Sequence, residues 1–290
     1  MSRPGPAASA AASAAASVRD LPLRILPAQL IATRHGLGGR NSMRLIERHA
    51  RVYRHTWMIL VSGFFEPLFY LLSIGVGIGM LVGQVSYAGH PVDYTSFVAP
   101  ALLATSAMNG AITDSTYNLF HRLKYDKVYD AALATPMRAG DLALGEIGWA
   151  LIRGGLYACA FLVVMLAMRL AHSAWTIAAL PVALLIGFGF AGIGMAATTF
   201  MRSWQHLEFV TLAMLPMFLF SATFYPLSVY PRPIQVVVEC LPLYQGTALL
   251  RGLTLGYVGP GLLWHVLYLA VMGVAGLSLA GHRISRLLLR

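Results

Sequence analysis

The chain has 290 residues, of which 58% are hydrophobic and only 11% are charged. Soluble domains carry about 25% charged residues, so this composition excludes a soluble globular protein and a disordered chain, and two cysteines exclude a disulfide scaffold. The formal net charge of +10 suggests nucleic acid, but nine of the 21 basic residues precede the first apolar segment. Basic residues gather there beside the cytoplasmic face of a membrane. No folded basic face with base-stacking groups is visible, so we expect membrane lipid and no nucleic acid as a partner.

The N-terminal part has two regions of different composition. Residues 1–39 begin with an Ala- and Ser-rich stretch, which makes a poor signal peptide and predicts a disordered cytoplasmic tail. Residues 40–56 interleave apolar and basic side chains, which predicts an amphipathic interface helix. A cytoplasmic extension of the first membrane span fits this pattern equally well. Its candidate interface residues are Arg44, Glu47, Arg48 and Arg51.

Six apolar segments approach the ~20 residues that a helix needs to cross a bilayer. They predict an all-α membrane protein with spans at Trp57–Val82, Ser96–Leu119, Ile147–Met168, Trp175–Phe200, Leu207–Tyr225 and Gly261–Ala280. Continuous apolar runs of this length exclude a β-barrel. With both termini cytoplasmic, the inner segments hold 17 basic residues and the outer segments three, which fixes the predicted orientation. Glycines at 187, 189, 192 and 194 predict close helix contacts.

Two connections are longer than a turn. The inner one, residues 121–146, mixes polar and apolar side chains. The outer one, residues 226–260, is too apolar for a free aqueous loop and predicts short helices at Ile234–Cys240 and Gly246–Leu255, separated by Pro242. Irregular backbone at membrane depth must pack on protein or line a cavity. We therefore expect a re-entrant segment before the last span.

Three ionisable residues fall inside the predicted spans: Glu66, Asp114 and Arg153. Such residues are costly in a membrane and are functional candidates by default. A proton relay or a polar patch on a substrate path, together with Asn109, is one interpretation. An interhelical polar contact is the other, and we favour it for Asp114 and Arg153. For Glu66 both interpretations stand.

Common catalytic motifs are missing from the sequence. Neither lysine follows a glycine, so there is no phosphate-binding G-x-x-x-x-G-K-[ST] loop. H-E-x-x-H zinc and G-x-S-x-G nucleophile motifs are absent too. We therefore expect no catalytic, metal or cofactor site on this chain.

The two long connections carry motifs that resemble a known family. The inner one contains Ala132-Leu133-Ala134-Thr135-Pro136 and Gly140-Asp141-Leu142. The outer region contains Phe224-Tyr225-Pro226-Leu227 and Leu241-Pro242-Leu243-Tyr244, followed by Arg251-Gly252. These motifs, with six spans, resemble the permease subunit of type-2 ABC exporters over about residues 40–290. Within them, the sequence is most similar to permeases of nodulation lipo-oligosaccharide export and anthracycline resistance.

The resemblance implies a half-transporter in the bacterial inner membrane: two permease copies form a homodimer, and two separate ATPase subunits bind ATP and Mg. The inner connection would contact the ATPase through Arg122, Asp126, Lys127, Asp130, Pro136, Asp141 and Glu146. The interface helix would touch the ATPase as well. The outer gate would include Phe224, Pro226, Pro242 and Arg251. A substrate path would run between the first, second and fifth spans of the two copies. At Ser221-Ala222-Thr223 the sequence departs from the family's usual Ser-Gly pair.

The leading hypothesis is thus an ATP-driven exporter permease for an amphipathic substrate, such as a drug, a lipid or a lipid-linked oligosaccharide. The alternative is a proton-coupled secondary transporter that uses Glu66 and Asp114. A membrane enzyme or a scaffold without transport has less support, because no clustered acid, base or metal set accompanies the spans.

Overall fold

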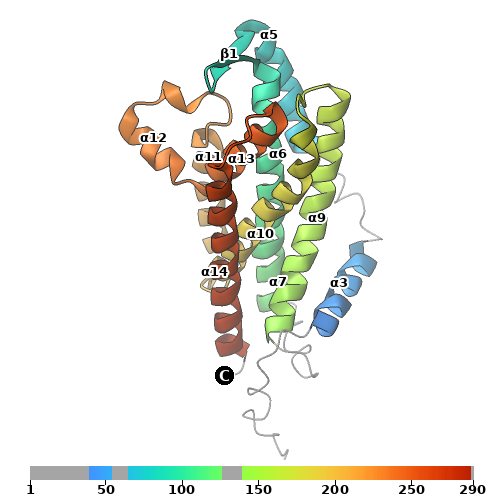
Figure 1. Cartoon of the computed structure of the whole chain (residues 1–290). Helices are drawn as coiled ribbons and strands as arrows, with labels where there is room; N and C mark the ends of the chain where they lie inside the picture. The colour runs from blue at the N-terminus through green and yellow to red at the C-terminus, as the bar shows by residue number, and fades with distance from the viewer. Residues whose placement is uncertain (1–38, 54–64, 126–138, 289–290) are drawn as a thin grey trace, which may run out of the picture. The chain divides into compact units, whose positions relative to one another are not determined.

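The computed structural model describes residues 39–53, 65–125 and 139–288 (Figure 1). The predicted N-terminal tail lies outside this part of the chain, apart from its last residue. The elements are α3 (Gly39–Tyr53), η1 (Leu71–Ile78), α5 (Gly79–Val82), β1 (Gln84–Tyr87), β2 (His90–Asp93), α6 (Tyr94–Thr113), η2 (Asp114–Asn118), α7 (Leu119–Lys124), α9 (Ala139–Ala167), η3 (Ala174–Ala178), α10 (Ala179–Thr198), α11 (His206–Phe220), η4 (Leu227–Val229), α12 (Arg232–Glu239), α13 (Pro242–Leu255) and α14 (Leu262–Leu288).

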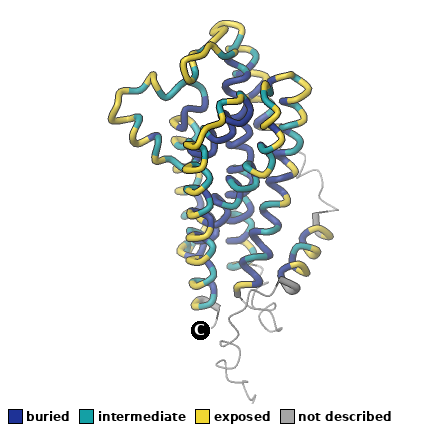
Figure 2. The backbone as a smooth tube through the Cα atoms, in the orientation of Figure 1, coloured by how far each residue is buried: buried dark blue, intermediate teal, exposed yellow. Residues whose placement is uncertain are grey.

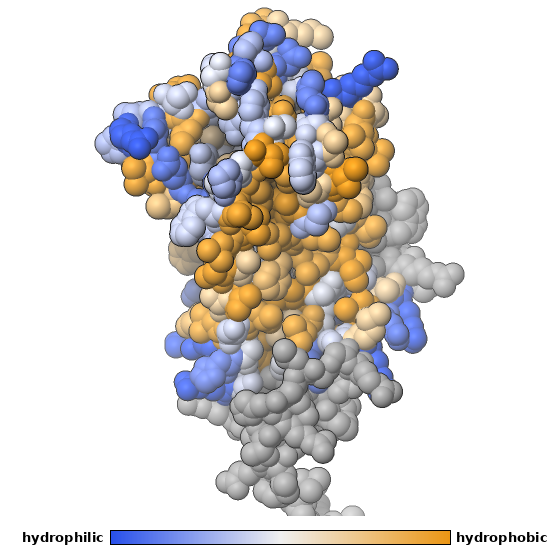
Figure 3. All heavy atoms as spheres, in the orientation of Figure 1, coloured by the Kyte–Doolittle hydropathy of each residue, from blue (hydrophilic) through white to orange (hydrophobic). Residues whose placement is uncertain are grey.

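Within the described residues, four helices are long and apolar enough to cross a membrane. They are Phe65–Val82, Gly140–Ala167, Ala174–Thr198 and Leu262–Arg286, and α11 is a shorter apolar helix. Figure 3 shows an apolar band across one face of the molecule, with hydrophilic side chains toward both ends. The helical membrane-protein class is as predicted, whereas six spans, their orientation and re-entry of the outer segment stay predictions.

The centre of the helix bundle is the continuous helical run α6–η2–α7. Almost every residue of α6 is buried, as Figure 2 shows by the dark tube in the interior. Two of its threonines hydrogen bond to their own helix: Thr105 Oγ1 donates to the carbonyl of Ala101 at 2.9 Å, and Thr113 Oγ1 donates to that of Asn109 at 2.7 Å. These bonds satisfy polar groups inside apolar surroundings. The helical run that contains the second predicted span, Ser96–Leu119, begins at Tyr94 and continues to Lys124.

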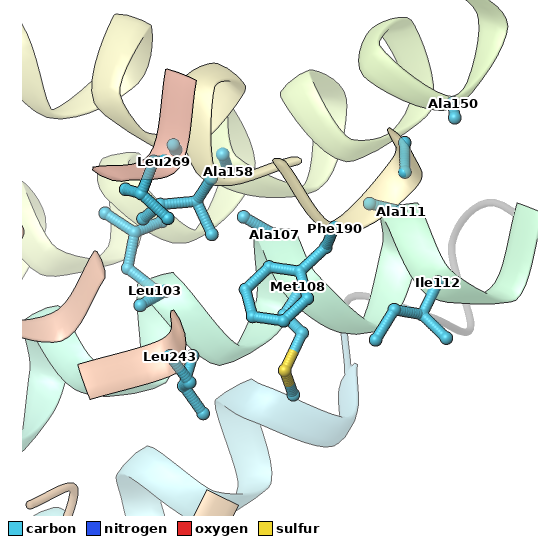
Figure 4. Packing of buried hydrophobic residues seen from close by; sticks show 14 of the residues in the cluster. Leu103, Ala107, Met108, Ala111, Ile112, Ala150, Ala158, Phe190, Leu243 and Leu269 are labelled. Carbon is cyan, nitrogen blue, oxygen red and sulfur yellow. The ribbon is translucent and has the colours of Figure 1, made fainter. Parts of the chain in front are cut away.

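Small and medium-sized apolar side chains pack around α6 (Figure 4). Ala107 and Met108 of α6 belong to one buried cluster with Phe190 of α10, Leu243 of α13 and Leu269 of α14. Burial at such sites contributes about 1.5–3 kcal/mol for each large side chain when the alternative is water. The same cluster thus joins the outer helix α13 to the spans.

Helices α10 and α14 approach each other closely along glycines. A Cβ atom on Gly192 would lie 2.6 Å from the carbonyl oxygen of Gly273, and one on Gly189 would lie 3.2 Å from that of Leu269. Any larger side chain at Gly192 would push the backbones apart. This contact confirms the predicted use of glycine for close helix packing.

The third predicted span starts earlier than expected. The described part of helix α9 already includes Ala139, well before Ile147, and Asp141 stands in its first described turn, where a carboxylate complements the helix dipole. Asp141 and Glu146 therefore belong to a helix and are not part of an inner loop. The helix therefore extends into the predicted inner connection, residues 121–146, whose contact with an ATPase stays a prediction.

The outer part contains both predicted short helices and one feature that the sequence did not reveal. Helices α12 and α13 match the predicted pair, with Pro242 at the start of α13 and Gly256 in a left-handed conformation (φ 88°) at its end. In Figure 1, α12 stands to one side, at the end opposite to the C-terminus. The unexpected feature is the antiparallel hairpin of β1 and β2, in which Val85 pairs with Val92.

Candidate functional site

A cavity of about 330 Å³ lies between three helices: Phe65–Val82, α6 with η2, and α11. Its lining combines apolar side chains such as Leu102, Met108 and Leu215 with polar ones such as Glu66 and Asn109. The predicted first, second and fifth spans therefore meet at a cavity. Two of the four predicted intramembrane polar residues lie on it.

A polar stripe follows the α6–η2 side of this cavity. Thr105, Asn109, Thr113 and Tyr117 all line it, and they are four residues apart in sequence. Residues at this spacing lie on one face of a helix. The stripe thus gives an otherwise apolar helix a row of hydroxyl and amide groups facing the cavity.

The first helix contributes a carboxylate and a ring. Glu66 is exposed and lines the cavity, and Tyr70, four residues later, lines it too. The Tyr70 ring lies 5.6 Å from the ring of Phe218 on α11, which is also part of the lining. Among the described residues, Glu66 takes part in none of the ion pairs. Its carboxylate therefore faces the cavity without a cationic side chain from this part of the chain.

A hydrogen bond joins two of the helices that line the cavity. Tyr117 of η2 donates its hydroxyl to the carbonyl of Leu207 at 3.3 Å, and the same oxygen lies 2.6 Å from Oγ1 of Thr211. Both partners belong to α11. This bond connects the second predicted span to the fifth, and Tyr117 and Thr211 both line the cavity.

Asp114 and Arg153 form a separate buried cluster. Nη1 of Arg153 donates to Oδ1 of Asp114 at 2.9 Å, and Nε donates to the hydroxyl of Tyr157 at 2.9 Å. The side chain of Asn118 donates to the same Asp114 oxygen. Asp114 and Arg153 are 4% and 7% exposed and do not line the cavity. This geometry favours the interhelical contact over a proton path shared with Glu66.

A second ionic cluster joins α3 to the bundle. Glu146 of α9 accepts hydrogen bonds from Arg122 of α7 and lies 3.1 Å from Nε2 of His49 on α3. Glu146 and His49 are both 5% exposed. Because hydrogen bonds to charged groups are stronger than neutral ones, this cluster holds α3, α7 and α9 together.

Close packing supports the same contact. Leu45 of α3 sits on Gly145, where a Cβ atom would lie 2.9 Å away, and Ile46 sits on Gly148 at 2.8 Å. The apolar face of α3 is therefore turned toward α9, while Arg44, Glu47, Arg48 and Arg51 are exposed. Exposed charges on a helix fixed in this way can face a partner or lipid headgroups.

Comparison with known proteins decides the family. The sequence matches the family described as ABC-2 type transporter over residues 41–255. This chain belongs to that family. Among curated proteins, it is 34% identical to nodulation protein J of Rhizobium leguminosarum bv. trifolii, over 78% of this chain and 85% of that protein.

Two further relatives of the same name support the assignment. Nodulation protein J of Rhizobium meliloti (strain 1021) is 34% identical over 66% of this chain and 72% of its own length. Nodulation protein J of Sinorhizobium fredii is 32% identical over 77% of this chain and 84% of its own length. The chain is therefore a bacterial membrane permease of the ABC-2 class, a transport subunit whose family implies an ATPase partner.

The ABC-2 inner connection is described only at its ends. Asp126, Lys127, Asp130 and Pro136 lie outside the described residues. Arg122 is half-buried against Glu146, whereas Asp141 is 2% exposed and sits in the first turn of α9. Asp141 and Glu146 are thus both buried within the described part of the chain, and their contact with an ATPase stays a prediction.

The predicted outer-gate residues of this ABC-2 chain lie on different parts of the outer end. Arg251 is 2% exposed, donates to the carbonyls of Phe97 at 2.9 Å and Ala222 at 3.0 Å, and stacks on the Phe97 ring at 3.6 Å. Burial lowers its pKa to about 10, which still leaves it charged at neutral pH. Phe224 packs at 5.2 Å on Phe218 of the cavity, whereas Pro226 and Pro242 begin helical turns. Arg251 therefore links α13 to α6 and to the turn after α11.

The sequence indicated Glu66 and Asn109 as candidates for the substrate path, but not the other residues of the polar stripe or His49. The stripe could have been found, because Thr105, Asn109, Thr113 and Tyr117 recur every four residues. His49 gave no such signal, since its partner Glu146 is 97 residues away.

Proposed function

We propose that this chain is the membrane-spanning subunit of an ATP-driven exporter that moves an amphipathic substrate out of the cytoplasm or inner leaflet. The observation that carries the proposal is the cavity between the first, second and fifth predicted spans. It offers a polar stripe on one helix and aromatic and apolar side chains on the others. A drug, a lipid or a lipid-linked oligosaccharide has both kinds of surface. The name of the relatives, nodulation protein J, is compatible with the last of these.

Energy would come from a separate ATPase. In the proposed complex, two copies of this chain work with two ATPase subunits, which carry ATP and Mg. The exposed charges of α3 and the inner connection would form the contact. Movement of the ATPase would then reach α9 and α7 through the Glu146 cluster, in which Glu146 is a positioning residue. The substrate path would lie along the cavity, between the two copies.

The test is a mild-detergent pull-down of the tagged chain from its native membrane, followed by mass spectrometry and by transport in proteoliposomes. We expect a stoichiometric nucleotide-binding subunit, and transport that needs ATP and persists without a proton gradient. Transport that survives ATP depletion and collapses with the proton gradient would overturn the proposal in favour of a secondary transporter.

A further inference from the structure

We infer that the cavity between Phe65–Val82, α6 and α11 selects amphiphiles whose polar end is an organic cation, in particular an ammonium group, over anionic ones. Glu66 would supply the counter-charge. The inference rests on the proposed function for the act of transport, but it concerns binding, which is measurable on this chain alone.

The position of Glu66 gives the first argument. An ionised carboxylate is costly in hydrocarbon, and Glu66 is exposed on an apolar helix rather than buried in a pair. Glu66 lines the same cavity as the polar stripe that contains Asn109. Asp114 does not line the cavity, and its charge is balanced by Arg153 at 2.9 Å. Among the described lining residues no basic side chain occurs, so within this part of the chain the Glu66 carboxyl group has no cationic neighbour on the cavity.

Aromatic rings beside the carboxylate give the second argument. Tyr70 lies one turn after Glu66, on the same helix face, and its ring is 5.6 Å from that of Phe218. Both rings line the cavity. The Phe218 ring also packs edge to face against the Phe224 ring, with the two ring centroids 5.2 Å apart. A carboxylate near aromatic rings attracts ammonium groups and repels anions.

The hydrogen-bonding direction of the stripe gives the third argument. The hydroxyl of Thr105 donates its one proton to the carbonyl of Ala101 at 2.9 Å, and that of Thr113 donates to the carbonyl of Asn109 at 2.7 Å. A hydroxyl has one donor and two acceptor positions, so both threonines present acceptor lone pairs to the cavity. These two threonines can therefore accept from the N–H groups of an ammonium and cannot donate to a sulfate, phosphate or carboxylate, whereas the Asn109 amide can do either.

The experiment compares two probes with the same tail. Binding of radiolabelled dodecylamine and of dodecanoate is measured at neutral pH on the full chain in phosphatidylcholine nanodiscs, with empty nanodiscs subtracted. We expect saturable binding of dodecylamine, tighter than that of dodecanoate by about tenfold. The Glu66→Gln substitution should weaken the binding of dodecylamine by a similar factor. It should not weaken the binding of dodecanoate.

Two variants keep the result interpretable. Glu66→Asp retains the charge and should keep the preference for dodecylamine, so it separates the charge from a folding defect at this position. Glu239→Gln removes a carboxylate on α12, outside the cavity, and should change nothing. Equal binding of both probes to the unmodified chain, or an unchanged preference in a folded Glu66→Gln chain, would overturn the inference.

A second arm separates two sources of the same chemistry. Nanodiscs that contain phosphatidylethanolamine offer a membrane amine as competitor. Displacement of dodecylamine by this lipid supports an aminolipid ligand, and unchanged binding supports a single-chain or soluble amine. A failed cation preference in a chain that still recruits its ATPase and transports with ATP would refute this inference and leave the proposed function intact.

Discussion

Ionisable side chains in apolar helices have opposite surroundings in two regions of this protein. Asp114 and Arg153 are almost fully buried and bonded to each other, and Glu146 is likewise buried against Arg122 and His49. Glu66 is exposed on a cavity whose described lining holds no basic residue. The residue types alone would place all of them in one class. Their partners assign the first set to holding helices together and Glu66 to the candidate substrate path.

The largest effect should follow from breaking the buried pair. Arg153→Leu leaves the Asp114 carboxylate buried without its cation, and the free energy of unfolding should fall by about 3–5 kcal/mol. A denaturant titration of the purified chain in detergent measures this. The double variant with Asp114→Asn should recover part of the loss. An Arg153→Leu chain as stable as the unmodified one would contradict a structural role for the pair.

A smaller effect is expected at the contact between α3 and the bundle. The Glu146→Gln substitution weakens charge-assisted hydrogen bonds to Arg122 and His49. The free energy of unfolding should fall by about 2 kcal/mol, and α3 should be held less firmly against the bundle. Hydrogen exchange with mass spectrometry should then show faster exchange in α3 peptides. Glu47→Gln, on the exposed face of the same helix, is the matched control. Unchanged exchange of α3 in the Glu146→Gln chain would refute the anchoring role.

Much of this organisation was readable in the sequence. The apolar runs predicted the long helices, and Pro242 was predicted to separate the two short outer helices. Helix α13 begins at Pro242 itself rather than at Gly246, because proline fits the first turn of a helix. Glycine spacing predicted close packing of α10. The beginning of α9 at Ala139 was missed, since periodicity cannot tell a helix that continues into the polar region from a loop beside it.

Pairing between distant residues was beyond sequence reasoning. Arg153 could have neutralised either Glu66 or Asp114, and only the packing of α9 on η2 decides for Asp114. The burial of Arg251 has the same origin, because its acceptors, the carbonyls of Phe97 and Ala222, come from segments far away in the chain. Backbone acceptors carry no signature in the sequence.

A modest effect is expected where η2 meets α11. Tyr117→Phe removes the hydroxyl that bonds to Thr211 and to the Leu207 carbonyl, at a cost of about 1 kcal/mol. The two helices η2 and α11 should then separate more easily at the cavity. Stability in the same titration tests the cost, and the labelling rate of a cysteine at Thr113 tests the opening. A labelling rate equal to that with Tyr117 intact would mean that this bond does not close the cavity.

The smallest effect is expected at the surface of α3. The carboxylate of Glu47 lies 4.0 Å from Arg51, and both side chains are mostly exposed. Glu47→Gln should therefore change the free energy of unfolding by about 0.5 kcal/mol or less. If Glu47→Gln lowered the free energy of unfolding as much as Glu146→Gln does, exposure would not distinguish stabilising ionic contacts from surface ones in this protein.

The most direct test of the account is water accessibility at position 109. In a background in which the free cysteines Cys159 and Cys240 are replaced by serine, Asn109→Cys is treated in native membranes with a charged, water-soluble thiol reagent. Val271→Cys, on an exposed apolar position of α14 away from the cavity, is the control. If the cavity is part of a substrate path, Asn109→Cys should react and Val271→Cys should not. If the cysteines at positions 109 and 271 were equally protected from the reagent, the cavity would not be part of a water-accessible substrate path.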